Sequence, residues 1–282
     1  MKCTIAALDL DGTLLNDKKN ISEDDLAALR ELAESGAQIV PATGRIVPGL
    51  RLVLDSLPFV RWAICSNGAG VYDLQTGENV HRAEIPVDTA LRVCEYMDGI
   101  NAIYDCYMDG WGYMTRSMYE RSDEFYADNP GIMQLVKKFR TPVDELKAYI
   151  KETNRPLQKL QLHFIDMDER RRQLIALPEL FPDLAVTSSL PNNIEINHIS
   201  ATKGRALSAL CGHLGLDIAH AAAFGDGGND LDMLKAAGLG VAMANATDSV
   251  KASADFVTRS NNESGVAYAV RTLGLSSGGQ SA

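Results

Sequence analysis

The sequence lacks the features that mark several large classes of protein. Its longest apolar stretches fall well short of the roughly 20 residues that a membrane-spanning helix needs. The first apolar run leads directly into acidic residues, unlike the layout of a signal peptide. No long basic run is present and the formal net charge is −10, which disfavours non-specific binding to nucleic acids and anionic membranes. A negatively charged small substrate stays possible if one pocket is locally positive.

Cysteine is also scarce. Five cysteines are scattered along 282 residues, an odd number with no Cys-x-x-Cys pair. This usage indicates reduced thiols in the core of a cytoplasmic protein. The apolar content of 46% and charged content of 23% are ordinary for a globular chain, and the length suits one large domain or two modest ones.

Two carboxylates one residue apart, Asp9 and Asp11, follow a short apolar run at residues 5–8. The run predicts a buried strand, and side chains two residues apart on extended backbone point the same way. Two acids on one side are costly unless a positive charge lies between them, which indicates a hard cation or a shared proton. The alternative is that both are solvated loop acids that cap the next element.

Strands and helices alternate in the first part of the chain. Strands are predicted at 4–9, 38–42 and 62–66, with helices at about 22–36 and 47–57 between them. Short connections in this order predict an α/β fold with a doubly wound parallel sheet. In such sheets ligands bind beyond the carboxyl ends of the strands. The polar residues that fall there are Asp9, Asp11, Thr43, Arg45 and Asn67.

The pattern changes from about residue 70, where hairpins are mixed with helices. Hairpins are predicted around Thr76-Gly77 and Asp109-Gly110, followed by a loop at 129–131 and a helix that begins near Pro142. We therefore expect an inserted α+β domain at 84–190 and a doubly wound core at 1–83 and 191–282.

The first pattern returns in the last third of the chain. A buried strand is predicted at 221–225, directly before Asp226, and Lys203 opens a predicted helix. If the strands before Asp9 and Asp226 are neighbours, the two carboxylates can share one Mg²⁺ ion, which takes few protein carboxylates and a phosphate oxygen. Lys203 would add a positive charge at the same edge.

Three further residues suit an anion at this edge. Thr43 offers a hydroxyl, and Gly12 and Gly44 allow backbone N–H groups to approach an anion closely. Cations, a hydroxyl and backbone donors around a carboxylate are typical of phosphoryl transfer, where positioning and charge neutralisation do most of the work.

Four segments in order resemble the motifs of the haloacid dehalogenase (HAD) superfamily. They are Asp9-Leu-Asp-Gly-Thr13, Ala42-Thr-Gly-Arg45, Lys203-Gly204 and Gly225-Asp-Gly-Gly-Asn-Asp230. Two more, Ser66-Asn-Gly-Ala69 and Val241-Ala-Met-Ala-Asn-Ala246, resemble its Cof-type sugar-phosphatase branch. The resemblance covers essentially the whole chain. It implies a Rossmann-like core, a large α/β cap of type C2 between the second and third motifs, and a Mg²⁺-dependent phosphatase of sugar phosphates or related metabolites.

The resemblance also implies catalytic roles. Asp9 would be the nucleophile that forms an aspartyl-phosphate, and Asp11 would be the general acid and then the general base. Thr43 and Lys203 would hold the transferring phosphoryl group. Mg²⁺ would be held by the side chains of Asp9 and Asp226 and by the backbone carbonyl of Asp11.

The remaining motif residues have two explanations each. By resemblance, Asn229 would contact phosphate or the metal shell, and Asp230 would orient a metal-bound water or Lys203. Asp230 could instead cap a helix start. Arg45 fits substrate binding and a structural salt bridge equally, and Asn67 fits the turn before Gly68 better than a ligand contact.

Other functions fit parts of this pattern. A phosphomutase on the same scaffold would return the phosphoryl group to a sugar instead of water. A receiver-like signalling module also uses Mg²⁺, a phospho-accepting aspartate, a threonine and a lysine, although Asp11 and the inserted domain argue against it. A protein that only binds phosphorylated metabolites is a further alternative. For the phosphatase we expect a small phosphorylated metabolite as partner, not nucleic acid or membrane, and the sequence carries no signal of oligomeric state.

Overall fold

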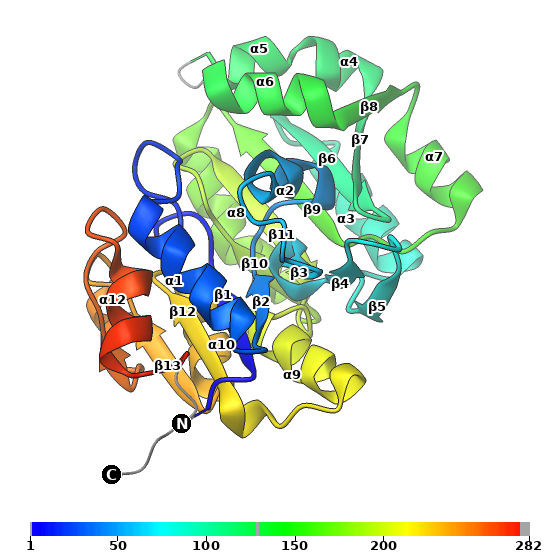
Figure 1. Cartoon of the computed structure of the whole chain (residues 1–282). Helices are drawn as coiled ribbons and strands as arrows, with labels where there is room; N and C mark the ends of the chain where they lie inside the picture. The colour runs from blue at the N-terminus through cyan, green and yellow to red at the C-terminus, as the bar shows by residue number, and fades with distance from the viewer. Residues whose placement is uncertain (1, 128–129, 277–282) are drawn as a thin grey trace. The chain divides into compact units, whose positions relative to one another are not determined.

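The computed structural model describes residues 2–127 and 130–276 (Figure 1). Within them the chain forms two compact units. Unit 1 comprises the described residues of Met1–Arg45, Leu50–Arg82 and Thr202–Ala282, and unit 2 comprises those of Ile46–Gly49 and Ala83–Ala201. In the described part of the chain, no helix combines the length and apolar character that a membrane span requires.

Unit 1 is built on a parallel five-stranded sheet with the order β14-β13-β12-β1-β2. The strands are β1 (Ile5–Leu8), β2 (Gln38–Pro41), β12 (Ala221–Gly225), β13 (Leu239–Ala242) and β14 (Phe256–Val257). This is the doubly wound parallel core that the strand–helix alternation predicts.

The two central strands of this sheet carry the two acids at their ends. β1 and β12 pair along their length, from Ile5 opposite Ala221 to Leu8 opposite Phe224, and every residue of both strands is buried. Continuous apolar runs are expected where both faces of a parallel sheet are covered. Asp9 and Asp226 therefore leave the sheet at the same edge, on neighbouring strands, which is the condition under which the two carboxylates can share one cation.

Helices follow the strands of unit 1. Ser22 caps α1 by accepting a hydrogen bond from the backbone N of Asp25 at 3.1 Å, and Ala28, Leu29 and Leu32 form the buried stripe of this helix. The helices of this part of the chain are α1 (Glu23–Glu34), α2 (Val47–Leu54), α9 (Lys203–Leu214), α10 (Leu231–Ala236), α11 (Asp248–Lys251) and α12 (Gly265–Thr272), and the 3-10 turns are η1 (Ser66–Gly68), η2 (Ile218–His220) and η3 (Gly228–Asp230).

The third strand differs from the prediction. β3 (Trp62–Cys65) pairs antiparallel with β4 (Gly70–Asp73), which pairs with β5 (Asn79–Arg82) in a separate three-stranded sheet. A single parallel bridge, Ala42 with Ile64, connects β3 to β2.

Pro41 gives a physical reason for this short connection. Backbone N–H groups of β2 alternate in direction, so that Ala42 N donates to Leu8 O and Thr43 N donates to Ile64 O on the other side. The donor before Thr43 on the β3 side would be residue 41, and proline has no N–H.

Unit 2 contains a six-stranded sheet with the order β10-β11-β9-β6-β7-β8. β6 (Ala102–Met108) and β7 (Trp111–Thr115) form the hairpin predicted at Asp109-Gly110, where both turn residues have positive φ. The other strands are β8 (Arg140–Val143), β9 (Lys159–Phe164), β10 (Leu184–Thr187) and β11 (Asn193–His198), and the helices are α3 (Val87–Met97), α4 (Arg116–Glu120), α5 (Ser122–Phe125), α6 (Pro130–Phe139), α7 (Leu146–Thr153) and α8 (Met167–Leu180).

Two segments of unit 2 differ from the sequence-based expectation. The loop expected at 129–131 lies partly outside the described residues, and α6 begins at Pro130, a residue that suits the first turn of a helix. Val136 and Phe139 form its buried side. β8 then pairs parallel with β7, so the next helix begins at Leu146 and not near Pro142.

The second boundary of the inserted unit also needs correction. We expected the core to resume at residue 191, whereas unit 2 continues to Ala201. The reason is the pairing of β11, which lies antiparallel between β9 and β10 and therefore completes the sheet of unit 2.

His163 on β9 gives unit 2 a pH-dependent stability. The side chain is fully buried, and its Nδ1 atom has no hydrogen-bond partner among the described residues. Burial lowers the pKa of His163 from 6.5 to about 3. The folded protein therefore keeps the ring neutral, while the unfolded chain protonates it below pH 6.5. Stability is present above that pH and is lost as the pH falls toward 3, by about 1.4 kcal/mol per pH unit.

We predict that His163→Gln removes this contribution. The free energy of unfolding of wild type and variant, measured by urea titration between pH 7.5 and 4.5, should converge as the pH falls because only wild type gains an extra proton on unfolding. Parallel curves would show that His163 does not titrate in this way.

Candidate active site

Lys203 connects two carboxylates at the carboxyl edge of the unit 1 sheet. It is the first residue of α9, whose start is capped by Thr202. Lys203 Nζ donates to Asp9 Oδ1 at 2.5 Å and to Asp230 Oδ1 at 2.6 Å. Asp9 is held in turn by its backbone N, which donates to Phe224 O of β12 at 3.0 Å. The four elements that meet here are β1, β12, α9 and η3.

The group is almost completely removed from solvent. Lys203 is 0% exposed, Asp230 1% and Asp9 8%. Burial alone would lower the pKa of Lys203, but the charges of Asp230 and Asp9 outweigh it and raise that pKa. Burial raises the pKa of Asp9; Lys203 opposes this rise, and Asp230 and Asp226 add to it. The pKa of Asp226 is raised by burial too. One lysine therefore lies beside three acids, and the group carries an excess of negative charge when all three are ionised.

The arrangement of the acids fits a hard divalent cation. Asp9, Asp226 and Asp230 each offer a carboxylate oxygen, and these oxygens lie within 4.8 Å of one another. Oxygen ligands at such spacing are what Mg²⁺ takes in proteins. Asp230 has other partners as well, because its Oδ2 accepts the backbone N–H groups of Asp226 and Gly227 at 3.0 and 2.9 Å. Both oxygens of Asp230 therefore already accept hydrogen bonds, from Lys203 and from the loop after β12.

The loop after β1 is built around Asp226. Thr13 Oγ1 donates to Asp226 Oδ1 at 2.7 Å. Gly12 has a φ of +92°, and a Cβ atom at this position would lie 2.4 Å from Asp226 Oδ2. Both the positive φ and the close approach require glycine here, so Gly12 is needed for the carboxylate to reach its position.

Asp11 is not one of the three clustered acids and has two cationic partners. Arg45 Nε and Nη2 donate to its two oxygens at 3.0 and 2.8 Å, and Lys19 Nζ donates to Oδ1 at 2.8 Å. Partial burial would raise the pKa of Asp11, but the hydrogen bonds and charges of Arg45 and Lys19 outweigh it and hold the pKa below the usual value. Of the two explanations for Arg45, the structure shows the salt bridge.

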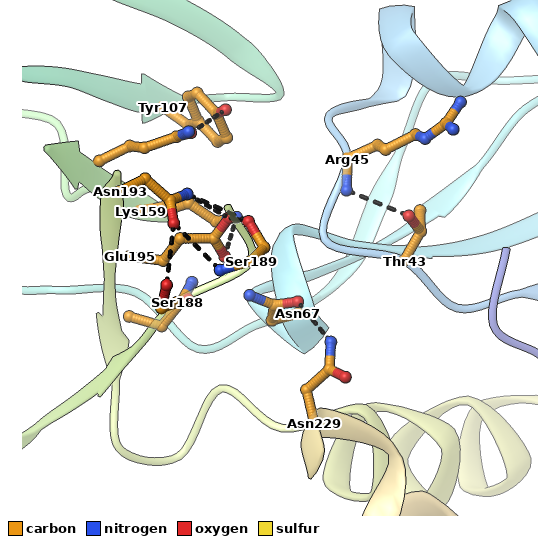
Figure 2. A network of polar contacts seen from close by, with 12 residues as sticks. Thr43, Arg45, Asn67, Tyr107, Lys159, Ser188, Ser189, Asn193, Glu195 and Asn229 are labelled. Carbon is orange, nitrogen blue, oxygen red and sulfur yellow. Dashed lines mark hydrogen bonds and ion pairs between the residues drawn. The ribbon is translucent and has the colours of Figure 1, made fainter. Parts of the chain in front are cut away.

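Thr43 and Asn67 connect the neighbouring strand ends of unit 1 (Figure 2). Thr43 is buried, and its Oγ1 accepts the backbone N–H of Arg45 at 3.2 Å across Gly44. Asn67 has a φ of +61° in η1, which supports the turn interpretation, and its backbone N donates to Thr43 O at 3.0 Å. Asn229 Nδ2 donates a hydrogen bond to Asn67 Oδ1 at 3.3 Å.

Some contacts of the site were not foreseen. Thr13 lies inside the first motif, so its bond to Asp226 could have been suspected from the sequence. Lys19 lies in a loop, where its own φ is +61°, and no sequence pattern predicts its contact with Asp11. Asn245, in the last resembling segment, donates from Nδ2 to Gly12 O at 2.8 Å.

We predict that Lys203→Met destabilises the protein in the presence of a chelator, by about 3–5 kcal/mol, because it leaves buried carboxylates without a cation. Adding Mg²⁺ should recover part of the loss. The measurement is the thermal midpoint with EDTA and with Mg²⁺. Lys235→Met on α10 is the control, since Lys235 is exposed. Equal midpoints for the two variants in EDTA would contradict the charge balance described above.

Known proteins resemble this chain over nearly its full length. Residues 6–270 match the family described as haloacid dehalogenase-like hydrolase. Phosphatase YwpJ of Bacillus subtilis (strain 168) is 32% identical over 283 residues, which cover 95% of this chain and 99% of that protein. From the same bacterium, 5-amino-6-(5-phospho-D-ribitylamino)uracil phosphatase YcsE is 31% identical over 268 residues, which cover 95% and 94%.

Solved structures give the same result. TM0651 from Thermotoga maritima is 30% identical and has a TM-score of 0.79 over 96% of this chain and 97% of its own. BT1666 from Bacteroides thetaiotaomicron, one of the phosphatases of the haloalkanoate (HAD) enzyme superfamily, is 27% identical with a TM-score of 0.79 over 97% of this chain and 96% of its own. The chain belongs to the haloacid dehalogenase-like hydrolases, in their Cof-type branch, and is a phosphoric monoester hydrolase.

Proposed function

We propose that this phosphatase needs Mg²⁺, hydrolyses small phosphorylated metabolites such as sugar phosphates, and works through an aspartyl-phosphate on Asp9. The observation that carries the proposal is the buried contact of Lys203 with Asp9 and Asp230, beside Asp226. The names of the relatives support it, because they describe phosphatases, one of them for a phosphorylated ribitylaminouracil.

In this mechanism Asp9 is the nucleophile. Lys203 holds Oδ1, which orients the carboxylate and offsets its charge. A carboxylate oxygen of Asp9 bonds to phosphorus while the bond from phosphorus to the leaving alkoxide breaks. Water then attacks the same phosphorus, the bond to Asp9 breaks, and inorganic phosphate leaves. Asp11 would protonate the leaving oxygen and later accept the proton from the attacking water. This role requires Arg45 and Lys19 to release Asp11 first, because their contacts hold its pKa low in this structure.

Other residues of the edge would bind the phosphoryl group. Thr43 and Lys203 would donate to its oxygens, together with backbone N–H groups near Gly12 and Gly44. Arg45 and Asn229 would contact substrate or phosphate. Arg45 can do so only if it leaves Asp11, to which it is bound in this structure.

A metal fits the same residues. Asp9 and Asp226 would hold Mg²⁺ with the backbone carbonyl of Asp11, while Asp230 orients Lys203. When bound, Mg²⁺ supplies positive charge that neutralises the phosphate oxygens. The excess of buried negative charge beside Lys203 supports this assignment.

Unit 2 would act as the cap that selects the organic part of the substrate. One face of its sheet is polar and nearly buried (Figure 2). On it, Lys159 Nζ donates to Glu195 Oε2 at 2.8 Å, and Arg140 Nε donates to Asp105 Oδ2 at 2.7 Å. Tyr107 Oη donates to Gln161 Oε1 at 2.7 Å. Buried ion pairs are costly to build, and alternating donors and acceptors suit a polyhydroxylated ligand.

We predict that Glu195→Gln alters substrate preference. The ratio of kcat/KM for the best metabolite to that for p-nitrophenyl phosphate should fall by about tenfold or more, because a buried, charge-assisted acceptor is lost. Glu179→Gln, at an exposed position on α8, is the control. An unchanged ratio in both variants would remove Glu195 from substrate selection.

We predict that Asp9→Asn abolishes phosphate release while the fold stays intact. The amide oxygen is a poor nucleophile, so no phospho-enzyme forms. The measurement is phosphate release from a panel of phosphorylated metabolites, with circular dichroism as the check of folding. Substantial residual activity would refute the nucleophile assignment.

Isomerised sugar phosphate without net release by wild type would instead favour the phosphomutase alternative, and a long-lived phosphoprotein without turnover would favour the signalling one.

A further inference from the structure

Asn245 fixes the position of Gly12 through both ends of its amide. Asn245 Nδ2 donates to Gly12 O at 2.8 Å, and Asn245 Oδ1 accepts the backbone N–H of Asn261 at 3.0 Å. One end must donate and the other must accept, so the orientation of the amide is defined by its partners. The segment Val241-Ala-Met-Ala-Asn-Ala246, which begins within β13, thus reaches the loop after β1.

A second asparagine secures the other side of the same loop. Asn261 is 4% exposed, and its Nδ2 donates to Leu15 O at 3.0 Å and to Asp17 Oδ1 at 3.3 Å. Its backbone N is the donor that orients Asn245. The loop at 12–17 is therefore held at both ends by residues that follow β13 and β14.

The contact at Gly12 continues to Asp226. Gly12 O and Thr13 N belong to one rigid peptide plane. Thr13 N donates to Leu10 O at 3.3 Å, and Thr13 Oγ1 donates to Asp226 Oδ1 at 2.7 Å. Because Gly12 has a φ of +92° and lacks a side chain to restrict it, the two hydrogen bonds of this peptide, from Asn245 Nδ2 to Gly12 O and from Thr13 N to Leu10 O, limit its rotation.

We propose that Asn245 is a positioning residue for the phosphatase reaction. It holds the peptide between Gly12 and Thr13, and through the Thr13 hydroxyl it sets the orientation of the Asp226 carboxylate. The part of this inference that concerns Mg²⁺ rests on the function proposed above, and the part that concerns turnover rests only on the phosphatase activity.

The test is Asn245→Asp, which has the same shape but places a carboxylate oxygen against Gly12 O. The loss of one hydrogen bond should weaken Mg²⁺ binding about three- to tenfold, measured by calorimetry on the protein without substrate. The maximal rate kcat should fall by a similar factor, with little change in KM. The added negative charge alone would strengthen cation binding, so weaker binding has to come from lost positioning.

Asn262→Asp is the matched control. Asn262 is exposed, and its amide also contacts the loop, with Nδ2 donating to Asp17 Oδ2 at 3.0 Å and Oδ1 accepting Asp17 N at 3.1 Å, but these bonds do not reach Gly12. A larger loss of Mg²⁺ affinity and kcat in Asn245→Asp, at similar thermal midpoints in EDTA, supports the proposal. Equal values of kcat and Mg²⁺ affinity in the two variants overturn it. Absence of Mg²⁺ binding by wild type would refute the proposed metal, and kcat would still decide the role of Asn245.

Discussion

The buried contact of Lys203 with Asp9 and Asp230 is the interaction on which the site depends. It requires β1 and β12 to be neighbours, α9 to begin at the lysine, and η3 to turn sharply after β12. A Cβ atom at Gly225 would lie 2.4 Å from Asp230 Cβ, so the turn is possible only with glycine there. The strand order, the start of one helix and the glycine of one turn together bring these charges into contact.

Charge balance distinguishes the two units. In unit 1, three neighbouring acids share one buried lysine, and the excess negative charge explains why a cation would stabilise the group. In unit 2, each of the buried pairs Lys159–Glu195 and Arg140–Asp105 combines one positive and one negative charge. This polar face would therefore bind a ligand through hydrogen-bond donors and acceptors and not through a further charged group. This difference is consistent with phosphate chemistry in one unit and recognition of an uncharged organic group in the other.

The sequence predicts the residues at the strand ends because burial and parallel order are encoded locally. The apolar runs before Asp9 and Asp226 specify strands, and the short connections specify their direction. Other features depend on contacts between distant segments. The pairing of Lys19 with Asp11 requires a loop conformation, and the position of β11 in unit 2 requires its partners β9 and β10. Neither leaves a periodic pattern that a sequence can show.

The central claim is that the phosphoryl group passes through Asp9, and rapid-quench single turnover tests it most directly. Wild-type protein would be mixed with a ³²P-labelled substrate that it hydrolyses, quenched in acid within milliseconds, and digested for mass spectrometry. We expect transient label on the peptide that contains Asp9, formed before free phosphate and chased by unlabelled substrate. Release of labelled phosphate at the full single-turnover rate, with no labelled protein at any time, would contradict a covalent intermediate at Asp9.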